Sequence, residues 1–224
     1  MAIKISFKVN EAVFLRDPEK SELGRAIIKH SIDLINNLGF EAFTFKKLAI
    51  EMGTTEASIY RYFENKHRLL LYIISWYWKY MDFLLDYQLQ NLTDQKIKLK
   101  TIIRLLTHEL PINAGELDYN IKFLNQIVIT ESSKVYLVKE VNEINKSEVF
   151  KPYKELCAKI ALVISAYNKK YPYPKSLSST IIEASHHQQF FCQHLPRLTD
   201  VTPKNKNEFA CQFIENLVFG VLGN

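Results

Sequence analysis

One face of the helix expected at residues 55–63 carries side chains that could make contacts with DNA. They are two hydroxyls, a carboxylate, a phenol and a guanidinium, contributed by Thr55, Ser58, Glu56, Tyr60 and Arg61. The opposite face holds the apolar residues Ile59 and Phe63. Packing alone would not require such an outer face, whereas hydroxyl and guanidinium groups contact phosphates and base edges. The pattern indicates a helix that reads nucleic acid.

The residues just before this helix predict a partner for it. Phe45, Leu48, Ala49 and Met52 recur at helical spacing, so residues 44–52 should form a short amphipathic helix. Gly53 suits the left-handed residue that ends a helix, and Thr54 or Thr55 can cap the next one. Two short helices joined by a tight turn are a helix-turn-helix. Another helix, at 23–38 and ended by Gly39, should precede them.

The run from Gly24 to Leu70 resembles the DNA-binding domain of the tetracycline-repressor (TetR) family. The resemblance rests on Phe40 and Thr44, on LAIEMG at the turn and on IYRYFENKHRLL after it. It covers about the first third of the chain. It implies a three-helix DNA-binding unit followed by a helical domain that binds small molecules and dimerises.

The resemblance also implies which residues would meet DNA. Phosphate-facing positions match Thr44, Tyr60, Tyr62 and Lys66, and groove-facing positions match Thr55, Glu56, Ala57, Ser58 and Arg61. Arg61 could pair with the O6 and N7 atoms of guanine, and Lys66 with a phosphate. Glu56 is open to two interpretations, because its carboxylate could accept from cytosine or simply lie solvated at a helix amino terminus.

The remainder of the chain predicts an all-α protein. A helix at 66–88 contains the nearly continuous apolar stretch Leu69–Leu85, in which Lys79 and Asp82 argue against a membrane span. Further helices are expected at 95–110, 118–130, 133–145, 149–169, 177–195 and 205–222, with a Pro-rich linker at 171–176. We expect an arm at 1–20, a helix-turn-helix domain at 21–68 and a regulatory and dimerisation domain at 69–224.

Aromatic residues of this second domain are candidates for contact with a small hydrophobic or aromatic ligand. They are Trp76, Tyr80, Phe83, Tyr119, Phe123 and Tyr153, although each of them singly is more often plain core. The last two expected helices carry more apolar residues than one bundle face usually needs. This predicts a homodimer whose interface includes Ile181, Ile182, Phe190, Phe213 and Leu217.

Composition constrains the function only broadly. The net charge of +5 permits nucleic acid without demanding it. Three cysteines, without metal-ligand spacing, suggest a reduced cytoplasmic protein. We expect no signal peptide, cofactor or metal, and the grouped histidines His186, His187 and His194 are assigned to packing or an interface. Residues 3–9 alternate like a strand, which is either an arm packed on the protein or one that brings Lys4 and Lys8 to DNA.

These observations together predict a cytoplasmic transcriptional regulator. We expect a repressor that binds a double-stranded DNA operator and is released from it by a small molecule. Two alternatives stay open from the sequence. The chain could bind DNA under the control of a protein partner instead of a ligand. It could also be a helical enzyme with a vestigial helix-turn-helix, although no catalytic motif or Gly-rich phosphate loop is present.

Overall fold

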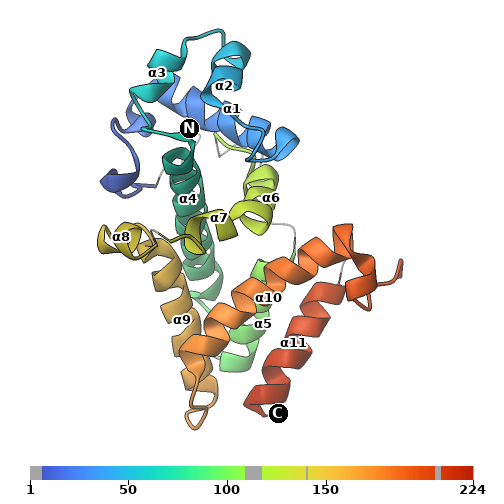
Figure 1. Cartoon of the computed structure of the whole chain (residues 1–224). Helices are drawn as coiled ribbons and strands as arrows, with labels where there is room; N and C mark the ends of the chain where they lie inside the picture. Colours follow the sequence, from blue (N-terminus) through green and yellow to red (C-terminus); the bar gives the residue numbers. More distant parts are fainter. Residues whose placement is uncertain (1–6, 109–117, 140, 205–207, 224) are drawn as a thin grey trace. The chain divides into compact units, whose positions relative to one another are not determined.

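A computed structural model of the chain describes residues 7–108, 118–139, 141–204 and 208–223. The regular secondary structure of these residues is all helical, and no strand occurs among them (Figure 1). The expected strand at 3–9 lies mostly outside the described residues, and residues 7–10 are neither helix nor strand. The prediction of an all-α fold is confirmed. No helix within the described residues is long and apolar enough to cross a membrane.

The chain divides into two compact units, each described here by itself. The first comprises Met1–Tyr80 with Pro111–Pro152, and the second Met81–Leu110 with Tyr153–Asn224. The helix α4 (Lys66–Leu89) contributes residues to both units. Neither unit begins or ends at residue 68, where the sequence suggested a domain boundary.

The first unit contains the expected helix-turn-helix. Its helices are α1 (Glu22–Leu38), α2 (Phe45–Glu51), α3 (Glu56–Tyr60), the first part of α4, α6 (Ile121–Glu131), α7 (Ser133–Tyr136) and α8 (Val141–Lys146), with short 3₁₀ turns at Glu11–Val13 and Pro18–Lys20. In Figure 1, α2 and α3 lie beside α1 at one end of this unit. The core between them is formed by Ile27, Ile32, Leu48, Ile59 and Phe63.

Local sequence explains where these short helices begin and turn. The side chains of Ser21, Thr44 and Thr55 each accept a backbone N–H in the first turn of α1, α2 and α3. Gly53 adopts a φ of 62°, a left-handed conformation that glycine tolerates best, and so lets the chain reverse between α2 and α3. Gly24 is needed for a different reason, because a Cβ there would lie 2.3 Å from the Pro18 carbonyl oxygen.

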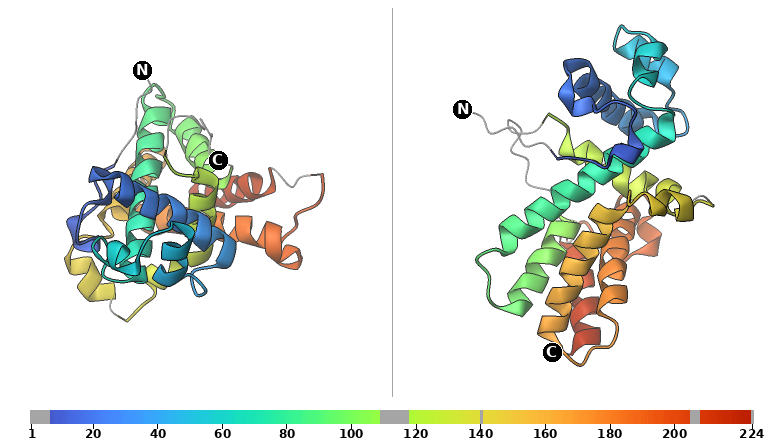
Figure 2. Two further views of the ribbon diagram at one scale, coloured as in Figure 1. Left: turned by 90° about the horizontal axis from the view of Figure 1, so that it is seen from above. Right: turned by 90° about the vertical axis from the view of Figure 1, so that its left-hand side faces the viewer.

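The second unit is built from long helices that run alongside one another (Figure 2). They are the end of α4, α5 (Gln95–Thr107), α9 (Lys151–Tyr167), α10 (Pro174–His194) and α11 (Phe209–Leu222), with a 3₁₀ turn at Pro196–Leu198. Helices α5, α10 and α11 pack on one another in pairs. The core residues shared by this packing include Leu99, Ile103, Ile181, Ile214 and Val218.

Two expectations for the middle of the chain are wrong. The single helix expected at 133–145 is two short helices, α7 and α8, because Leu137 leaves the helical conformation at the end of α7. The Pro-rich linker is shorter than expected, since Pro174 is already the first residue of α10. Proline is well suited to that position, where its missing N–H would have no helical partner.

Candidate DNA-binding surface

The outer face of α3 presents most of the residues that the sequence singled out for DNA. Thr55, Ala57, Tyr60 and Arg61 are exposed, and Glu56 and Ser58 are half-buried. Ile59 is fully buried on the opposite face, together with Phe63 just after the helix. The burial of those two side chains fixes which side of the helix faces outward.

The hydroxyls of this face are held by hydrogen bonds within the chain itself. The Thr55 hydroxyl accepts the backbone N–H of Ser58 at 3.3 Å and shares a hydrogen bond with the Ser58 hydroxyl at 3.0 Å. Thr44, also exposed, accepts the N–H of Lys47 at 3.2 Å at the start of α2. These side chains therefore already act as helix caps, and a phosphate or base contact would be an additional use of the same oxygens.

Arg61 and Tyr60 differ from their neighbours in how they are held. No hydrogen bond or ion pair holds the Arg61 guanidinium among the described residues. The ring of Tyr60 packs edge-on against Phe45, with centroids 5.0 Å apart, yet 48% of Tyr60 remains exposed. The guanidinium of Arg61 can therefore still form hydrogen bonds. The ring of Tyr60 packs on Phe45 at one side and is otherwise partly exposed.

Tyr62 does not belong to this face, which corrects the expectation that it meets a phosphate. It is only 2% exposed, and its hydroxyl lies 2.8 Å from the hydroxyl of Ser21. The Arg16 guanidinium covers its ring at 5.3 Å. Tyr62 therefore connects the end of the helix-turn-helix to the capping residue of α1.

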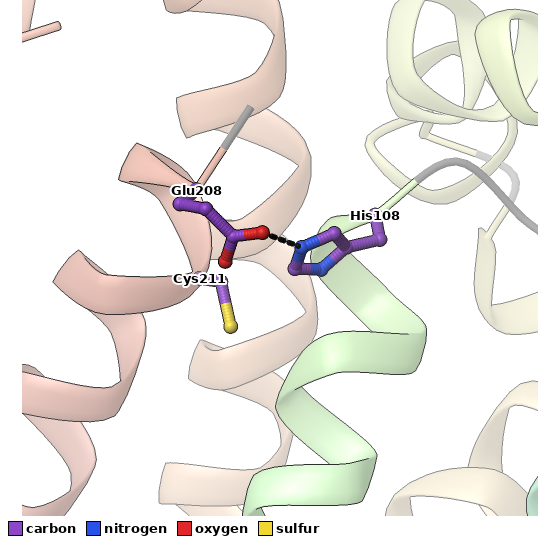
Figure 3. Close-up of side chains that lie close together, drawn as sticks. All are labelled: His108, Glu208 and Cys211. Carbon is purple, nitrogen blue, oxygen red and sulfur yellow. Dashed lines mark hydrogen bonds and ion pairs between the residues drawn. The ribbon is translucent and has the colours of Figure 1, made fainter. Parts of the chain in front are cut away.

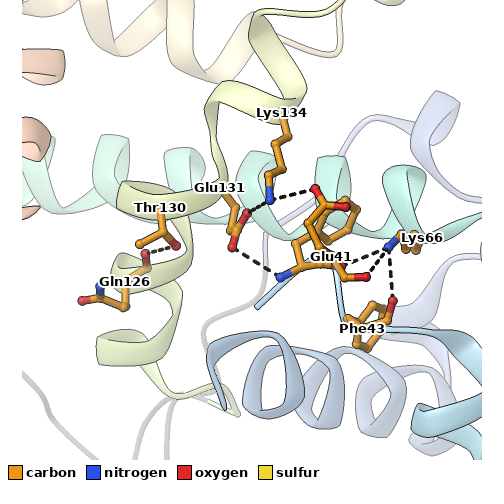
Figure 4. Close-up of polar contacts among 8 residues, drawn as sticks. Glu41, Phe43, Lys66, Gln126, Thr130, Glu131 and Lys134 are labelled. Atoms are coloured by element: carbon orange, nitrogen blue, oxygen red, sulfur yellow. Dashed lines mark hydrogen bonds and ion pairs between the residues drawn. The ribbon is translucent and has the colours of Figure 1, made fainter. Parts of the chain in front are cut away.

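Lys66 has a structural role that the sequence did not reveal. Its ammonium donates to the backbone carbonyls of Phe40, Glu41 and Phe43, at 3.0, 3.1 and 3.3 Å (Figure 4). It also lies 4.7 Å from the centre of the Phe40 ring. An ammonium has three N–H donors, so all of them are used. In this arrangement Lys66 connects α4 to residues 39–44, the corner between α1 and α2, and does not point outward to solvent.

The same corner is fastened from its other side by α6 and α7. The Glu131 carboxylate accepts the backbone N–H of Phe40 at 3.3 Å and pairs with Lys134 at 2.6 Å. Lys134 also pairs with Glu41 at 3.0 Å (Figure 4). The hydrogen bond and charge of Lys134 lower the pKa of Glu41. Burial opposes the charge on Lys134, but its hydrogen bonds to both carboxylates outweigh burial and raise its pKa.

Sequence reasoning missed this ion-pair group, which we call the corner clamp: Glu41, Glu131 and Lys134. A signal was present, because Glu131 continues the apolar stripe of α6 formed by Leu124, Ile127 and Val128. A carboxylate on a buried stripe needs a partner to compensate its lost hydration. Glu131 is buried, and Lys134 together with the Phe40 N–H supplies that compensation.

The structure brings together three of the six aromatic ligand candidates. Trp76 stacks on Tyr80 with centroids 5.9 Å apart and meets Tyr119 edge-on at 5.1 Å. The Tyr119 hydroxyl donates to Glu19 at 2.7 Å, and the Tyr72 hydroxyl donates to the same oxygen at 3.2 Å. Burial, followed by the charge of Glu19, raises the pKa of both phenols well above the usual value.

One atom of this aromatic cluster has its hydrogen-bonding capacity unused. The indole N–H of Trp76 is buried and has no acceptor among the described residues. Such a donor costs free energy unless something accepts its hydrogen bond.

The remaining ligand candidates lie elsewhere. Phe123 is half-buried on α6. Phe83 and Tyr153 belong to the second unit, where Phe83 is exposed and Tyr153 donates to Glu183 at 2.8 Å. The six residues therefore do not form a single cluster in either unit.

The dimer candidates also divide into two sets. Ile181 and Ile182 are 0% exposed inside a single chain, so they are intramolecular core and the prediction of an interface role for them is wrong. Phe213 is 38% exposed, and Phe190 and Leu217 are half-buried. Only the latter three retain surface that a partner chain could cover.

Comparison with known proteins agrees with the motif. The family described as "Bacterial regulatory proteins, tetR family" matches residues 27–73, which run from α1 into α4. No curated protein matches the chain.

Solved structures share the fold at low sequence identity. AibR in complex with isovaleryl coenzyme A and operator DNA has a TM-score of 0.58 at 16% identity, covering 87% of this chain and 97% of AibR. The fatty acid degradation regulator FadR from Bacillus halodurans has a TM-score of 0.54 at 15% identity, covering 89% and 94%. The superantigen PfiT reaches 0.59 at 17% identity, covering 93% and 100%. At these identities the likeness establishes the fold alone. The helix-turn-helix region, residues 27–73, is therefore similar to the DNA-binding region of the tetR family of bacterial regulatory proteins.

Proposed function

We propose that the chain is a DNA-binding transcriptional regulator of the TetR family, a repressor that binds its operator through the outer face of α3 and leaves it when a small molecule binds. The observation that carries the proposal is the exposed face of α3, with its ordered hydroxyls and an Arg61 guanidinium that nothing in the described chain holds. An unheld guanidinium can offer both donors of its fork to the O6 and N7 atoms of guanine. Tyr60 on that face and Thr44 at the start of α2 suit phosphate contacts, which position the protein without reading sequence.

A homodimer is the assembly that this function requires. A single α3 of five residues reads too little DNA for a specific site, whereas two copies can enter successive major grooves about 34–36 Å apart. Phe213 and Leu217 on α11, with Phe190 on α10, keep apolar surface exposed in the single chain. We assign the dimer contact to this surface, which we call the α10/α11 face.

The ligand is proposed to be hydrophobic or aromatic, with a polar atom that can accept a hydrogen bond. The stacked rings of Trp76, Tyr80 and Tyr119 supply apolar surface, and the buried indole N–H of Trp76 supplies a donor without a partner. AibR, of the same fold, was solved with isovaleryl coenzyme A and operator DNA, which supports a search among acyl compounds. A ligand can release DNA only if it binds the released conformation more tightly.

The test begins with selection of DNA sites from a random library by the full-length chain. We expect a palindromic site with two half-sites, and Arg61→Ala should lose most of its preference for that site over random DNA. The matched control is Arg197→Ala, which removes another exposed arginine, from the second unit. Selection of no sequence, or equal losses in both variants, would contradict DNA readout by α3.

The ligand step is tested on the selected site. Acyl compounds and aromatic acids would be titrated into the protein–DNA complex, while tryptophan fluorescence and DNA release are recorded together. We expect release to accompany a change in fluorescence, because Trp76 lies in the aromatic cluster and the only other tryptophan is Trp78. Release by a purified protein partner, with no compound effective, would favour the alternative of protein control.

A further inference from the structure

Three side chains of the kinds that bind metal ions meet in the second unit, where α5 ends and α11 begins. His108 follows the last residue of α5, Glu208 precedes the first residue of α11, and Cys211 lies in the first turn of α11. The His108 Nε2 atom is 3.3 Å from the Glu208 Oε1 atom, and the ligand atoms of all three residues lie within 4.8 Å of one another. Figure 3 shows the imidazole facing the carboxylate, with the Cys211 sulfur close to both.

The hydrogen bonds around His108 determine which ring nitrogen is free to bind. The Thr107 hydroxyl donates its single proton to the Ile103 carbonyl at 2.7 Å. If that proton stays on Ile103, the oxygen accepts in its 3.3 Å contact with the Nδ1 atom of His108, which favours the tautomer with the proton on Nδ1. In the neutral ring the lone pair is then on Nε2, which is the nitrogen that faces Glu208. A hydrogen bond from the other ring nitrogen is the usual support of a metal-binding histidine.

In that tautomer the Nε2 lone pair and the Glu208 carboxylate face each other at 3.3 Å and repel unless a cation stands between them. The cation can be a proton on Nε2 or a metal ion. A proton would make an ion pair between partly exposed groups, which contributes little stability and involves no thiol. Glu208 stands at the start of α11, but its side chain makes no capping hydrogen bond there, so its carboxylate is available. The nearby thiol of Cys211 is what favours a metal ion.

We propose that His108, Glu208 and Cys211 form a binding site for a divalent metal ion of the zinc type. Zinc prefers imidazole nitrogen, thiolate sulfur and carboxylate oxygen, at bond lengths of about 2.0–2.3 Å. Tetrahedral ligands at those lengths lie about 3.3–3.8 Å apart. The ligand atoms lie within 4.8 Å of one another, so the donors would have to approach by up to about 1.5 Å. Rotation of the exposed Glu208 side chain can provide part of this movement. Three protein ligands leave a fourth position for water or a small ligand.

Binding would replace a proton on the thiol. Burial raises the pKa of Cys211. The ion forms the metal–sulfur bond as the S–H bond breaks, and the proton leaves to solvent with no change of oxidation state. The bound ion would join the end of α5 to the start of α11, the helix that carries Phe213 and Leu217.

The experiment uses Co²⁺, whose bond to a thiolate absorbs in the near ultraviolet. The full-length protein would be stripped with a chelator under reducing conditions and titrated with Co²⁺. We expect one thiolate-to-cobalt band that saturates at one ion per chain and that Zn²⁺ abolishes by displacement. Cys211→Ser should lose the band, and His108→Ala should weaken Co²⁺ binding at least about tenfold, since even supporting residues of metal sites cost that much.

Matched controls are provided by the other thiols and histidines. The double variant Cys157→Ser/Cys192→Ser keeps Cys211 as its only thiol and should retain the band. His187→Ala, on the exposed side of α10, should bind as tightly as the unchanged protein. Circular dichroism and the His108→Ala titration keep the test decisive if Cys211→Ser folds poorly. Absence of a thiolate band, or its persistence in Cys211→Ser, would overturn the proposal. The contact between His108 and Glu208 would then be a hydrogen bond without a metal ion.

Discussion

The ammonium of Lys66, the first residue of α4, donates to the carbonyl oxygen of Phe40 at 3.0 Å and lies over the ring of the same residue. Phe40 also donates its N–H to Glu131. The carbonyl of Phe40 is therefore hydrogen-bonded to α4, and its N–H to α6. The corner between α1 and α2 is thereby held by two helices of the same unit. A change in either helix can alter the position of the helix-turn-helix.

The first prediction concerns Lys66. Lys66→Met should lower the free energy of unfolding by about 1–3 kcal/mol, because three backbone carbonyls, two of them in half-buried hydrogen bonds, lose a charged donor. Urea denaturation would measure this, with Lys46→Met as the control, since Lys46 is an exposed lysine of α2. An unchanged stability, combined with a salt dependence of DNA binding reduced by about one charge, would instead restore the phosphate contact suggested by the family resemblance.

The two tyrosines that flank Arg61 should respond in opposite ways to loss of the hydroxyl. Tyr62→Phe removes the hydrogen bond to Ser21 and should cost about 1 kcal/mol of stability, with little effect on DNA affinity. Tyr60→Phe should leave stability unchanged and weaken binding to all DNA sequences alike. Denaturation and binding measured on both variants would decide the matter. The reverse pattern would mean that the face of α3 is assigned wrongly.

Removal of one partner from the corner clamp should be costly. Lys134→Met leaves the buried Glu131 carboxylate without its cation, so we expect a loss of about 1.5–3 kcal/mol. In a double-mutant cycle with Glu131→Gln, the two losses should be clearly less than additive. The exposed pair Glu143–Lys146, also at a spacing of three residues, is the control and should show almost no coupling. Additive losses at the clamp would show that the pair does not act as a unit.

The proposed dimer face can be tested by introducing charge. Phe213→Glu with Leu217→Glu should convert a dimer to a monomer in sedimentation equilibrium and should abolish binding to a two-half-site operator. Leu162→Glu is the control, because Leu162 is a strongly exposed leucine of α9. A dimer that survives the double substitution, or one that Leu162→Glu breaks equally well, would place the interface elsewhere.

The buried His186 should make stability depend on pH. Burial, with the nearby charge of His187 as a smaller cause, lowers the pKa of His186 to about 4. Between that value and the usual pKa of about 6.5 the unfolded chain binds more protons, so stability should fall as the pH drops through this window. His186→Gln should flatten that part of the urea-midpoint profile. His187→Gln, at an exposed neighbouring position, should keep it, and an equal effect of both would contradict the assignment.

The sequence by itself determined the helices and the DNA-binding motif. The spacing of Phe45, Leu48 and Ala49, the glycine at 53 and the capping threonines are local features, and local features suffice to specify short helices and the turn between them. The outer face of α3 followed from the same periodicity, because burial of Ile59 and Phe63 fixes which residues face outward. The short break between α7 and α8 did not follow, since no proline or glycine marks it.

Only the tertiary structure decided the roles of residues whose partners are distant in the chain. Tyr62 and Lys66 looked like DNA contacts until Ser21 and the carbonyls near Phe40 were found beside them. Ile181 and Ile182 looked like interface residues until α5 and α11 were found packed on α10. His108 and Glu208 are separated by 100 residues, so no spacing rule could pair them. Periodicity reports which face of a helix is apolar, but not what covers it, and that depends on contacts which the fold alone creates.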